Sequence, residues 1–172
     1  MSSVYPLEWP CFFTSTIYQW KQVLKYDSYK DIIIESLQYL VKENRVILNG
    51  YVVMSNHVHF IWQPKQGSYT GIQSAFMKFT ANRIKAKLQS DNDELLSEFL
   101  VNKYDRKYQV WKREPLIVEL FTTEVLEQKL EYIHQNPVRA GLCRYPEEYF
   151  YSSASFYHDR SDKFGIITDY RG

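Results

Sequence analysis

The sequence contains few cysteines, no long apolar run and almost no net charge. Its two cysteines, Cys11 and Cys143, lie far apart and outside any CxxC spacing, so they offer no thiolate metal site and are typical of a reducing compartment. No stretch approaches the roughly 20 apolar residues that a membrane span requires, and no basic region followed by an apolar one opens the chain. We therefore expect a soluble, cytoplasmic protein with no membrane partner.

The formal net charge is only +1, so the whole-chain balance argues neither for nor against a nucleic-acid partner. One region is more basic, because the segment 77–113 carries nine Lys or Arg residues against five acids. A phosphate backbone would bind there if anywhere, although surface helices commonly look like this without binding anything. The predicted DNA-binding residues are Lys78, Asn82, Arg83 and Lys85.

The 172 residues, 45% of them apolar, are enough for one compact core. We expect a single domain over residues 1–157, with a C-terminal extension from about residue 142, and a tail over 158–172. No internal repeat or low-complexity tract divides the chain.

The pattern of apolar residues predicts an alternating series of strands and helices. Strands are expected at 11–20, 46–54, 57–63 and 108–112, and helices at 28–44, at 69–89 and from Thr122 or Thr123 to Asn136. Ser28 is expected to cap the first helix, Phe79 to share the buried side of the second with Ile72 and Phe76, and Pro137 to stop the third. Residues 90–105 are expected to be a disordered or mobile connection. This order is that of a ferredoxin-like α+β sandwich, with an antiparallel sheet, helices packed on it and one additional helix.

Two histidines begin the strand expected at 57–63. Because side chains alternate along a strand, His57 and His59 point the same way, and one metal ion could bind both. Asn56, in the tight turn before them, could orient the strand end. On spacing alone, a solvent-exposed pair at the end of a hairpin is the more common explanation.

A second polar pair lies on the last predicted helix. Tyr132 and Asn136 are four residues apart, so their side chains share one helix face, beside the buried Ile133. A phenol is a poor nucleophile at neutral pH unless a cation or base stabilises its anion, and a divalent ion held by His57 and His59 would do so while also polarising a phosphate. The residue types therefore suit phosphoryl transfer, with imidazole and oxygen ligands compatible with Mg²⁺ or Mn²⁺.

Each of these residues also has a structural explanation. Tyr132 could lie at the helix flank without a catalytic role, and Asn136 could be a C-terminal helix cap. Glu131 could act as a base but is more often solvated at such a position. His134 points away from the proposed face and is expected at the surface.

Three segments together resemble a known family. They are 50–59 (GYVVMSNHVH), 132–142 (YIHQNPVRAGL) and 148–153 (EYFYSS). Occurring in this order, they are similar to the HUH single-tyrosine transposases, and within them to the REP-associated tyrosine transposase branch. The resemblance extends from the first strand to about residue 157 and is weaker over 111–121, from which no site residue is inferred.

The resemblance implies a nicking and joining enzyme for single-stranded DNA that folds into imperfect hairpins, as in DNA transposition and recombination. It assigns Tyr132 as the nucleophile of a 5′-phosphotyrosine intermediate, His57 and His59 as the metal pair, and Asn136 as the polar residue that completes the metal shell. The mobile-element branch usually has Gln where this chain has the shorter Asn136. Relatives act as monomers or as homodimers, and the sequence does not decide between them.

Two other functions fit the same residues. One is a non-catalytic module that binds DNA hairpins, and the other is a metal-dependent phosphoesterase that uses activated water, with Tyr132 only structural.

Overall fold

The computed structural model describes residues 9–65 and 69–172. The strands are β1 (Cys11–Thr16), β2 (Val46–Val53), β3 (His57–Pro64), β4 (Leu100–Lys103), β5 (Arg106–Tyr108) and β6 (Leu116–Glu119). The helices are α1 (Asp27–Lys42), α2 (Tyr69–Asp91), α3 (Asp93–Ser97), α4 (Thr123–Arg139) and α5 (Ala154–Asp159), with 3-10 turns η1 (Tyr18–Trp20), η2 (Val23–Lys25) and η3 (Pro146–Glu148). Within the described ranges, no helix is both long and apolar enough to cross a membrane.

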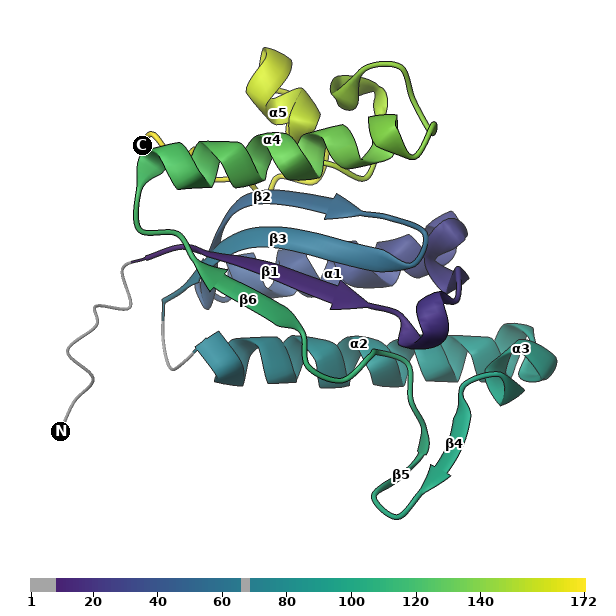
Figure 1. Ribbon diagram of the computed structural model, residues 1–172. Helices are drawn as coiled ribbons and strands as arrows, with labels where there is room; N and C mark the ends of the chain where they lie inside the picture. The colour runs from purple at the N-terminus through teal and green to yellow at the C-terminus, as the bar shows by residue number, and fades with distance from the viewer. Residues whose placement is uncertain (1–8, 66–68) are drawn as a thin grey trace, which may run out of the picture.

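The centre of the molecule is an antiparallel sheet with the strand order β2-β3-β1-β6. Helices α1 and α2 cover one face and α4 covers the other (Figure 1). Strands β4 and β5 form a separate two-stranded ribbon that projects from the body. The α+β class, the antiparallel sheet and the β-α-β-β-α-β order of its elements are as predicted.

Strand β3 divides its side chains between two cores. Val58, Phe60 and Trp62 are buried in the core beneath α1 and α2. His57, His59 and Ile61 face the opposite way, and Ile61 belongs to the smaller core beneath α4. The predicted division of this strand into a packing side and a polar side is therefore confirmed.

Helix α4 packs closely on the sheet through Leu126, Leu130 and Ile133. The Thr122 hydroxyl caps it by accepting a hydrogen bond from the Val125 amide at 3.2 Å. The helix reaches β2 at Gly50, where a methyl group in place of the α-hydrogen would lie 2.5 Å from Cδ1 of Leu130. Only a glycine permits this approach without displacing the neighbour.

The C-terminal segment covers the outer edge of β2. The Val53 amide donates to the Tyr151 carbonyl at 2.9 Å, and the Ser153 amide donates to the Tyr51 carbonyl at 3.0 Å. Farther on, the Thr168 amide donates to the Leu48 carbonyl. This pairing protects an edge that would otherwise expose its backbone groups.

The expected end of the last helix is wrong. Helix α4 continues through Pro137 to Arg139. A proline in the last turn removes only its own N–H donor, and the amides that follow remain bonded, since Leu142 donates to the Pro137 carbonyl at 2.9 Å. Gly141 follows the C-cap Ala140, and its φ of +72° does not fit a right-handed helix, which explains why the helix stops at Arg139.

Three other expectations about the elements are also wrong. Helix α1 begins at Asp27, one residue before the predicted cap Ser28, and its carboxylate lies in the first turn, where the helix dipole favours negative charge. The fourth sheet strand is β6 rather than 108–112, although Trp111 is buried as expected. The segment 90–105, expected to be disordered or mobile, contains α3 and β4.

Two expectations about side chains and strand ends are corrected too. Phe79 is exposed, because the buried side of α2 continues through Thr80 and Ile84. The first strand stops at Thr16, since Gln19 and Trp20 adopt positive φ angles that a strand cannot contain.

Candidate active site

The two histidines lie side by side at the first end of β3. In the sheet, His57 pairs with Thr16 of β1, and His59 pairs with Thr14. Their ring centroids are 4.8 Å apart, His59 is buried and His57 is half-buried. The face of the sheet that they share is covered by α4. The pair is therefore not exposed at the end of a hairpin, which is the arrangement that spacing alone favours.

Each imidazole has one ring nitrogen bound to a neighbouring oxygen. The Nδ1 atom of His57 is 2.7 Å from Oδ1 of Asn56, and Nδ1 of His59 is 2.7 Å from Oγ1 of Thr14. When Nδ1 carries the proton and donates it to these oxygens, the Nε2 atom of each ring keeps its lone pair. This is how partners outside the ligand shell fix a histidine for metal binding.

Burial keeps both rings neutral near pH 7. It lowers the pKa of His57 below its ordinary value. It also lowers the pKa of His59 to about 3, with smaller effects from the positive charges of His57, Arg139 and Lys129. Because only a neutral imidazole has a lone pair for a metal, the surroundings favour the ligand form of both residues.

Helix α4 brings Tyr132 and Asn136 to the histidines. The Tyr132 ring meets the His59 ring edge to face, with centroids 5.5 Å apart, and is 46% exposed. The Asn136 amide lies 3.3 Å from Nε2 of His57. The four residues that the sequence placed in one site are therefore adjacent in space, although their chemical roles stay predictions.

The donor set differs from that of a structural zinc site, which has four protein ligands. Two imidazoles and one amide are present, and an exchange of the Asn136 amide nitrogen and oxygen would turn an oxygen towards the Nε2 side. Among the described residues, no group of three or more His, Cys, Asp or Glu could hold a metal. The remaining positions around a bound ion would be left to water or to phosphate oxygens, as is usual for Mg²⁺.

Two cations flank Tyr132, and the sequence interpretation missed both. The Arg139 guanidinium lies 4.8 Å from the centre of the Tyr132 ring and donates to the Tyr132 carbonyl at 2.8 Å. The Lys129 ammonium lies 5.9 Å from the same ring. Lys129 lies three residues before Tyr132, and Arg139 lies seven after it. Both spacings put side chains on one face of a helix, so this arrangement could have been predicted from the sequence.

Thr14 was missed for a different reason. Its hydroxyl contacts His59 only because β1 and β3 are neighbours in this register. Sequence spacing within one strand contains no information about which residue lies opposite on another.

The predicted DNA-binding residues do not lie beside the histidines. Lys78, Asn82, Arg83 and Lys85 are all on α2, which packs on the other face of the sheet (Figure 1). Arg83 also forms an ion pair with Glu35 at 2.8 Å, which neutralises one of the three charges. A role for these residues in binding DNA stays a prediction, and it would concern a different face from the one that holds Tyr132.

The expectation that His134 lies at the surface is wrong. His134 is 7% exposed, and its Nε2 is 2.8 Å from the Ser153 hydroxyl. Burial lowers its pKa to about 4. Glu131 is exposed and accepts a hydrogen bond from Gln135 at 3.0 Å, which is consistent with a solvated position.

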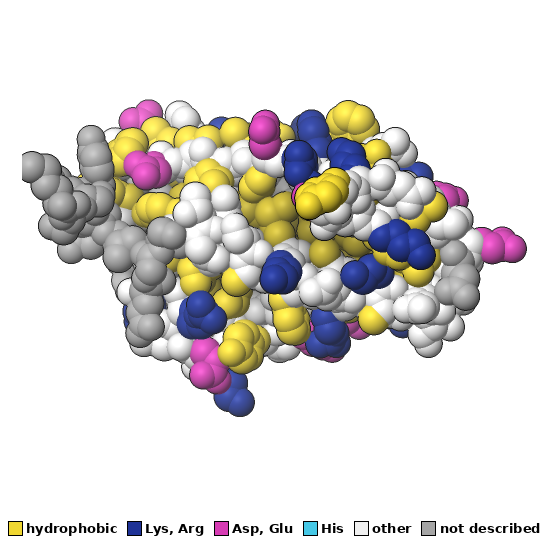
Figure 2. Space-filling view, turned by 90° about the horizontal axis from the view of Figure 1, so that it is seen from below, with side chains coloured by type: hydrophobic (Ala, Val, Ile, Leu, Met, Phe, Trp, Pro, Cys, Tyr) yellow, Lys and Arg dark blue, Asp and Glu magenta, His cyan; other side chains and the backbone are white. Residues whose placement is uncertain are grey.

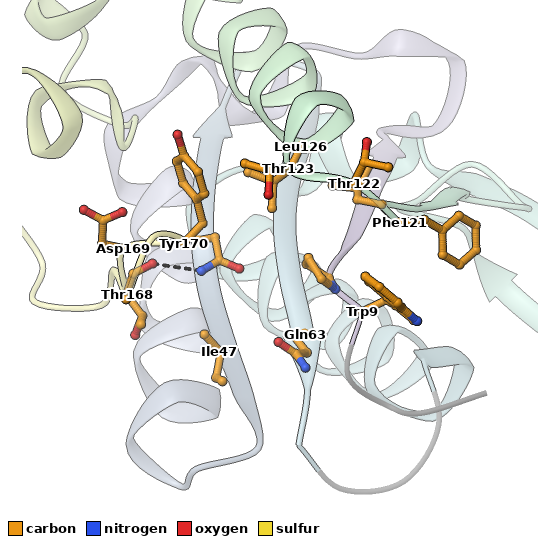
Figure 3. A pocket seen from close by; sticks show the side chains of 14 residues that line it. Trp9, Ile47, Gln63, Phe121, Thr122, Thr123, Leu126, Thr168, Asp169 and Tyr170 are labelled. Atoms are coloured by element: carbon orange, nitrogen blue, oxygen red, sulfur yellow. Dashed lines mark hydrogen bonds between the residues drawn. The ribbon is translucent and has the colours of Figure 1, made fainter. Parts of the chain in front are cut away.

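A pocket of about 370 Å³ lies at the opposite end of α4 (Figure 3). Its walls include Trp9 and Phe121 on one side and the segment 168–170 on the other, with the beginning of α4 above. Gln63, at the far end of β3 from the histidines, forms part of the floor. None of the predicted site residues lines this pocket.

The sequence matches no protein-family model and no curated protein. Among solved structures, the chain is similar to a REP-associated tyrosine transposase bound to a REP hairpin, with a TM-score of 0.65 and 17% identity over 98% of this chain and 87% of that chain. It is also similar to a proposed transposase from Deinococcus radiodurans R1, with a TM-score of 0.49 and 14% identity over 78% of this chain and 94% of the other. The chain therefore has the fold of a REP-associated tyrosine transposase.

Proposed function

We propose that this protein cuts and rejoins single-stranded DNA through a covalent link to Tyr132, and that it acts on strands that fold into hairpins. The observation that supports this most strongly is the meeting of Tyr132 and Asn136, from α4, with His57 and His59, from β3. The two pairs are at least 73 positions apart in the chain. Together they place a phenol, a side chain that can act as a nucleophile, beside side chains that can bind a metal. The solved structure with this fold, a transposase bound to a REP hairpin, supports the choice of substrate.

In the proposed reaction, the Tyr132 oxygen attacks the phosphorus of a backbone phosphate. The bond from phosphorus to the 3′ oxygen of the preceding nucleotide breaks, and that oxygen takes up a proton while the phenol loses its own. The phosphate stays attached to Tyr132 and to the 5′ end of the following strand. A 3′ hydroxyl can later attack this ester and restore a continuous backbone, so joining needs no external energy source.

His57, His59 and Asn136 would hold a divalent ion, Mg²⁺ or Mn²⁺, which when bound would polarise the scissile phosphate. Asn56 and Thr14 hold the two imidazoles in the orientation required for this. Arg139 and Lys129 place positive charge beside the Tyr132 ring, where it would attract the DNA backbone.

The test is to mix the protein with a single-stranded DNA hairpin and Mn²⁺ and to separate the products under denaturing conditions. We expect a protein–DNA adduct that carries the 5′ phosphate at Tyr132, together with a released strand that ends in a 3′ hydroxyl. Tyr132→Phe should abolish the adduct while retaining DNA binding and the same circular dichroism spectrum. Tyr145→Phe is the matched control, since this exposed tyrosine lies outside the site.

The other two functions predict different products. Binding without cleavage, unaffected by His57→Ala, would indicate a hairpin-binding module. Cleavage without an adduct, retained in Tyr132→Phe, would indicate a phosphoesterase that uses activated water. Either result would contradict the proposed function.

A further inference from the structure

The ribbon formed by β4 and β5 projects from the molecule and is basic. The segment 100–113 contains five Lys or Arg residues and one acid, Asp105. Asp105 pairs with Arg106 at 2.6 Å and with Arg113 at 3.4 Å. In the described part of the chain, no acidic side chain pairs with the remaining three cations, Lys103, Lys107 and Lys112, all of which are exposed.

Aromatic side chains are exposed on and beside the ribbon. Tyr104 lies in the turn at its tip and is fully exposed. Trp20, in η1, is 63% exposed, and the Lys112 ammonium lies 5.3 Å from the centre of its ring. On a duplex, lysines contact phosphates, and an exposed side chain can contact base edges and thymine methyl groups in the major groove.

The base of the ribbon is joined to the histidine end of the sheet. The Lys112 amide donates to the Thr16 carbonyl at 2.7 Å, and Thr16 lies opposite His57 in the sheet. The Asn56 amide group, which contacts His57 through its oxygen, reaches the Trp20 carbonyl at 3.5 Å. A continuous set of contacts therefore runs from His57 through Trp20 and Lys112 to the ribbon.

We infer that the ribbon, with Lys103, Tyr104, Lys107, Lys112 and Trp20, is a binding surface for the duplex stem of a DNA hairpin whose unpaired strand enters the Tyr132 site. This rests on the proposed function. A two-stranded ribbon, with strands about 4.8 Å apart, fits the major groove of B-DNA, which is roughly 12 Å wide. A four-residue strand spans about 13 Å, or roughly four base pairs.

This surface differs from the predicted one on α2. Figure 2 looks onto the underside of the molecule, where Lys and Arg side chains are spread over the surface. On α2, Arg83 and Lys87 are paired with Glu35 and Asp91, and among the described residues Lys78 and Lys85 form no ion pair. The segment 77–113 thus has two unpaired lysines on α2 and three on or beside the ribbon.

The experiment compares two DNA probes in the Tyr132→Phe background, where no cleavage occurs. One probe is a hairpin whose stem is about one helical turn, roughly 10 base pairs, and the other is an unstructured strand of the same length. Binding is followed by fluorescence anisotropy between 50 and 200 mM salt. The variant replaces Lys103, Lys107 and Lys112 by Gln, and the matched control replaces Lys42, Lys65 and Lys163 by Gln.

The ribbon variant should bind the hairpin at least about 10-fold more weakly, and the slope of log affinity against log salt should fall by about 2 to 3, as for the loss of three phosphate contacts. Its affinity for the unstructured strand should change less than twofold, and the control should retain the hairpin preference. Equal weakening for both probes, or for neither, would overturn the inference. Tyr104→Ala, which removes no charge, should weaken hairpin binding without changing the salt slope.

The two proposals fail separately. If no adduct forms at Tyr132 but the ribbon variant loses its hairpin preference, the proposed chemistry is wrong and the stem surface stands. If the ribbon variant keeps both its hairpin preference and its adduct, the stem surface is wrong and the chemistry stands.

Discussion

The two faces of the central sheet differ in what their side chains do. The face under α1 and α2 is lined by large apolar residues, such as Phe13, Phe60 and Trp62, in contact with Phe76 of α2. The face under α4 has a smaller apolar core and carries His57 and His59 at one end. A single strand, β3, contributes to both. One face is therefore filled by large apolar side chains, and the other combines a smaller apolar core with a polar pair.

Phe60→Ala should give the largest effect and tests the packing face. The ring is fully buried against Phe13, Trp62 and Phe76, so its loss should cost about 3–5 kcal/mol in the free energy of unfolding. On the other face of the same strand, His57→Ala should lower the free energy of unfolding by only about 1 kcal/mol or less, because this ring is half-exposed. Urea unfolding followed by circular dichroism measures both, and equal losses would contradict the division between the faces.

Lowering the pH should destabilise the protein mainly through histidines on the side of the sheet covered by α4. The pKa of His134 is about 4 in the folded protein against 6.5 ordinarily, so the unfolded chain binds more protons between these values. Stability should therefore fall as the pH drops from 6.5 towards 4, by at most about 1.4 kcal/mol per pH unit for this group. His59 contributes in the same direction down to its pKa of about 3.

His134→Gln keeps a hydrogen-bond donor near the Ser153 hydroxyl but cannot titrate. Its unfolding free energy, measured in urea from pH 7 to pH 4 in the presence of a chelator, should fall less steeply than that of the parent protein. Parallel pH profiles for the two proteins would show that His134 is not the titrating group.

Thr14→Val tests the support of the proposed metal ligands. The substitution keeps the shape of the side chain but removes the hydroxyl 2.7 Å from Nδ1 of His59. Affinity for Mn²⁺, measured by calorimetry, should fall about 10- to 100-fold. Ser15→Ala is the matched control, because its buried hydroxyl has no hydrogen-bond partner among the described residues and points to the other face. A similar loss of Mn²⁺ affinity in both variants would show that the Thr14 hydroxyl has no specific role in supporting His59.

Gly50→Ala should have only a small effect on stability. The added methyl group would lie 2.5 Å from Cδ1 of Leu130 and 3.3 Å from Cδ1 of Ile133, so α4 or its side chains must shift. We expect a cost of about 1 kcal/mol, at the low end for overpacking, because the nearest atom is the tip of a side chain. The double variant with Leu130→Ala should recover part of this cost, and strict additivity of the two changes would show that they do not interact.

The polar side of β3 and the face of α4 that holds Tyr132 and Asn136 could be predicted from the sequence, because each follows from the repeat of a single strand or helix. The alternation of His57, Val58 and His59 and the four-residue step from Tyr132 to Asn136 are fixed by strand and helix geometry. The ribbon, the fourth sheet strand and the partner of His59 could not be read in this way. Strands of three or four residues contain too little pattern, and the contact between Thr14 and His59 depends on which strands become neighbours.

The burial of His134 illustrates the same limit. Its position on α4 places it one step from Ile133, on a side that a two-layer arrangement would leave in solvent. The C-terminal segment covers that side and supplies the Ser153 hydroxyl. The burial of a residue on one helix was therefore decided by a segment 19 residues later in the chain.

Gly50 is not one of the proposed site residues, yet it affects how closely α4 can approach the sheet. Because this point of β2 has no side chain, Leu130 and Ile133 pack against its backbone, and the same helix holds Tyr132. A larger residue here would press on the helix that positions Tyr132 without replacing Tyr132 or either histidine. Variants that change the proposed activity while every proposed site residue is intact should be sought at this contact.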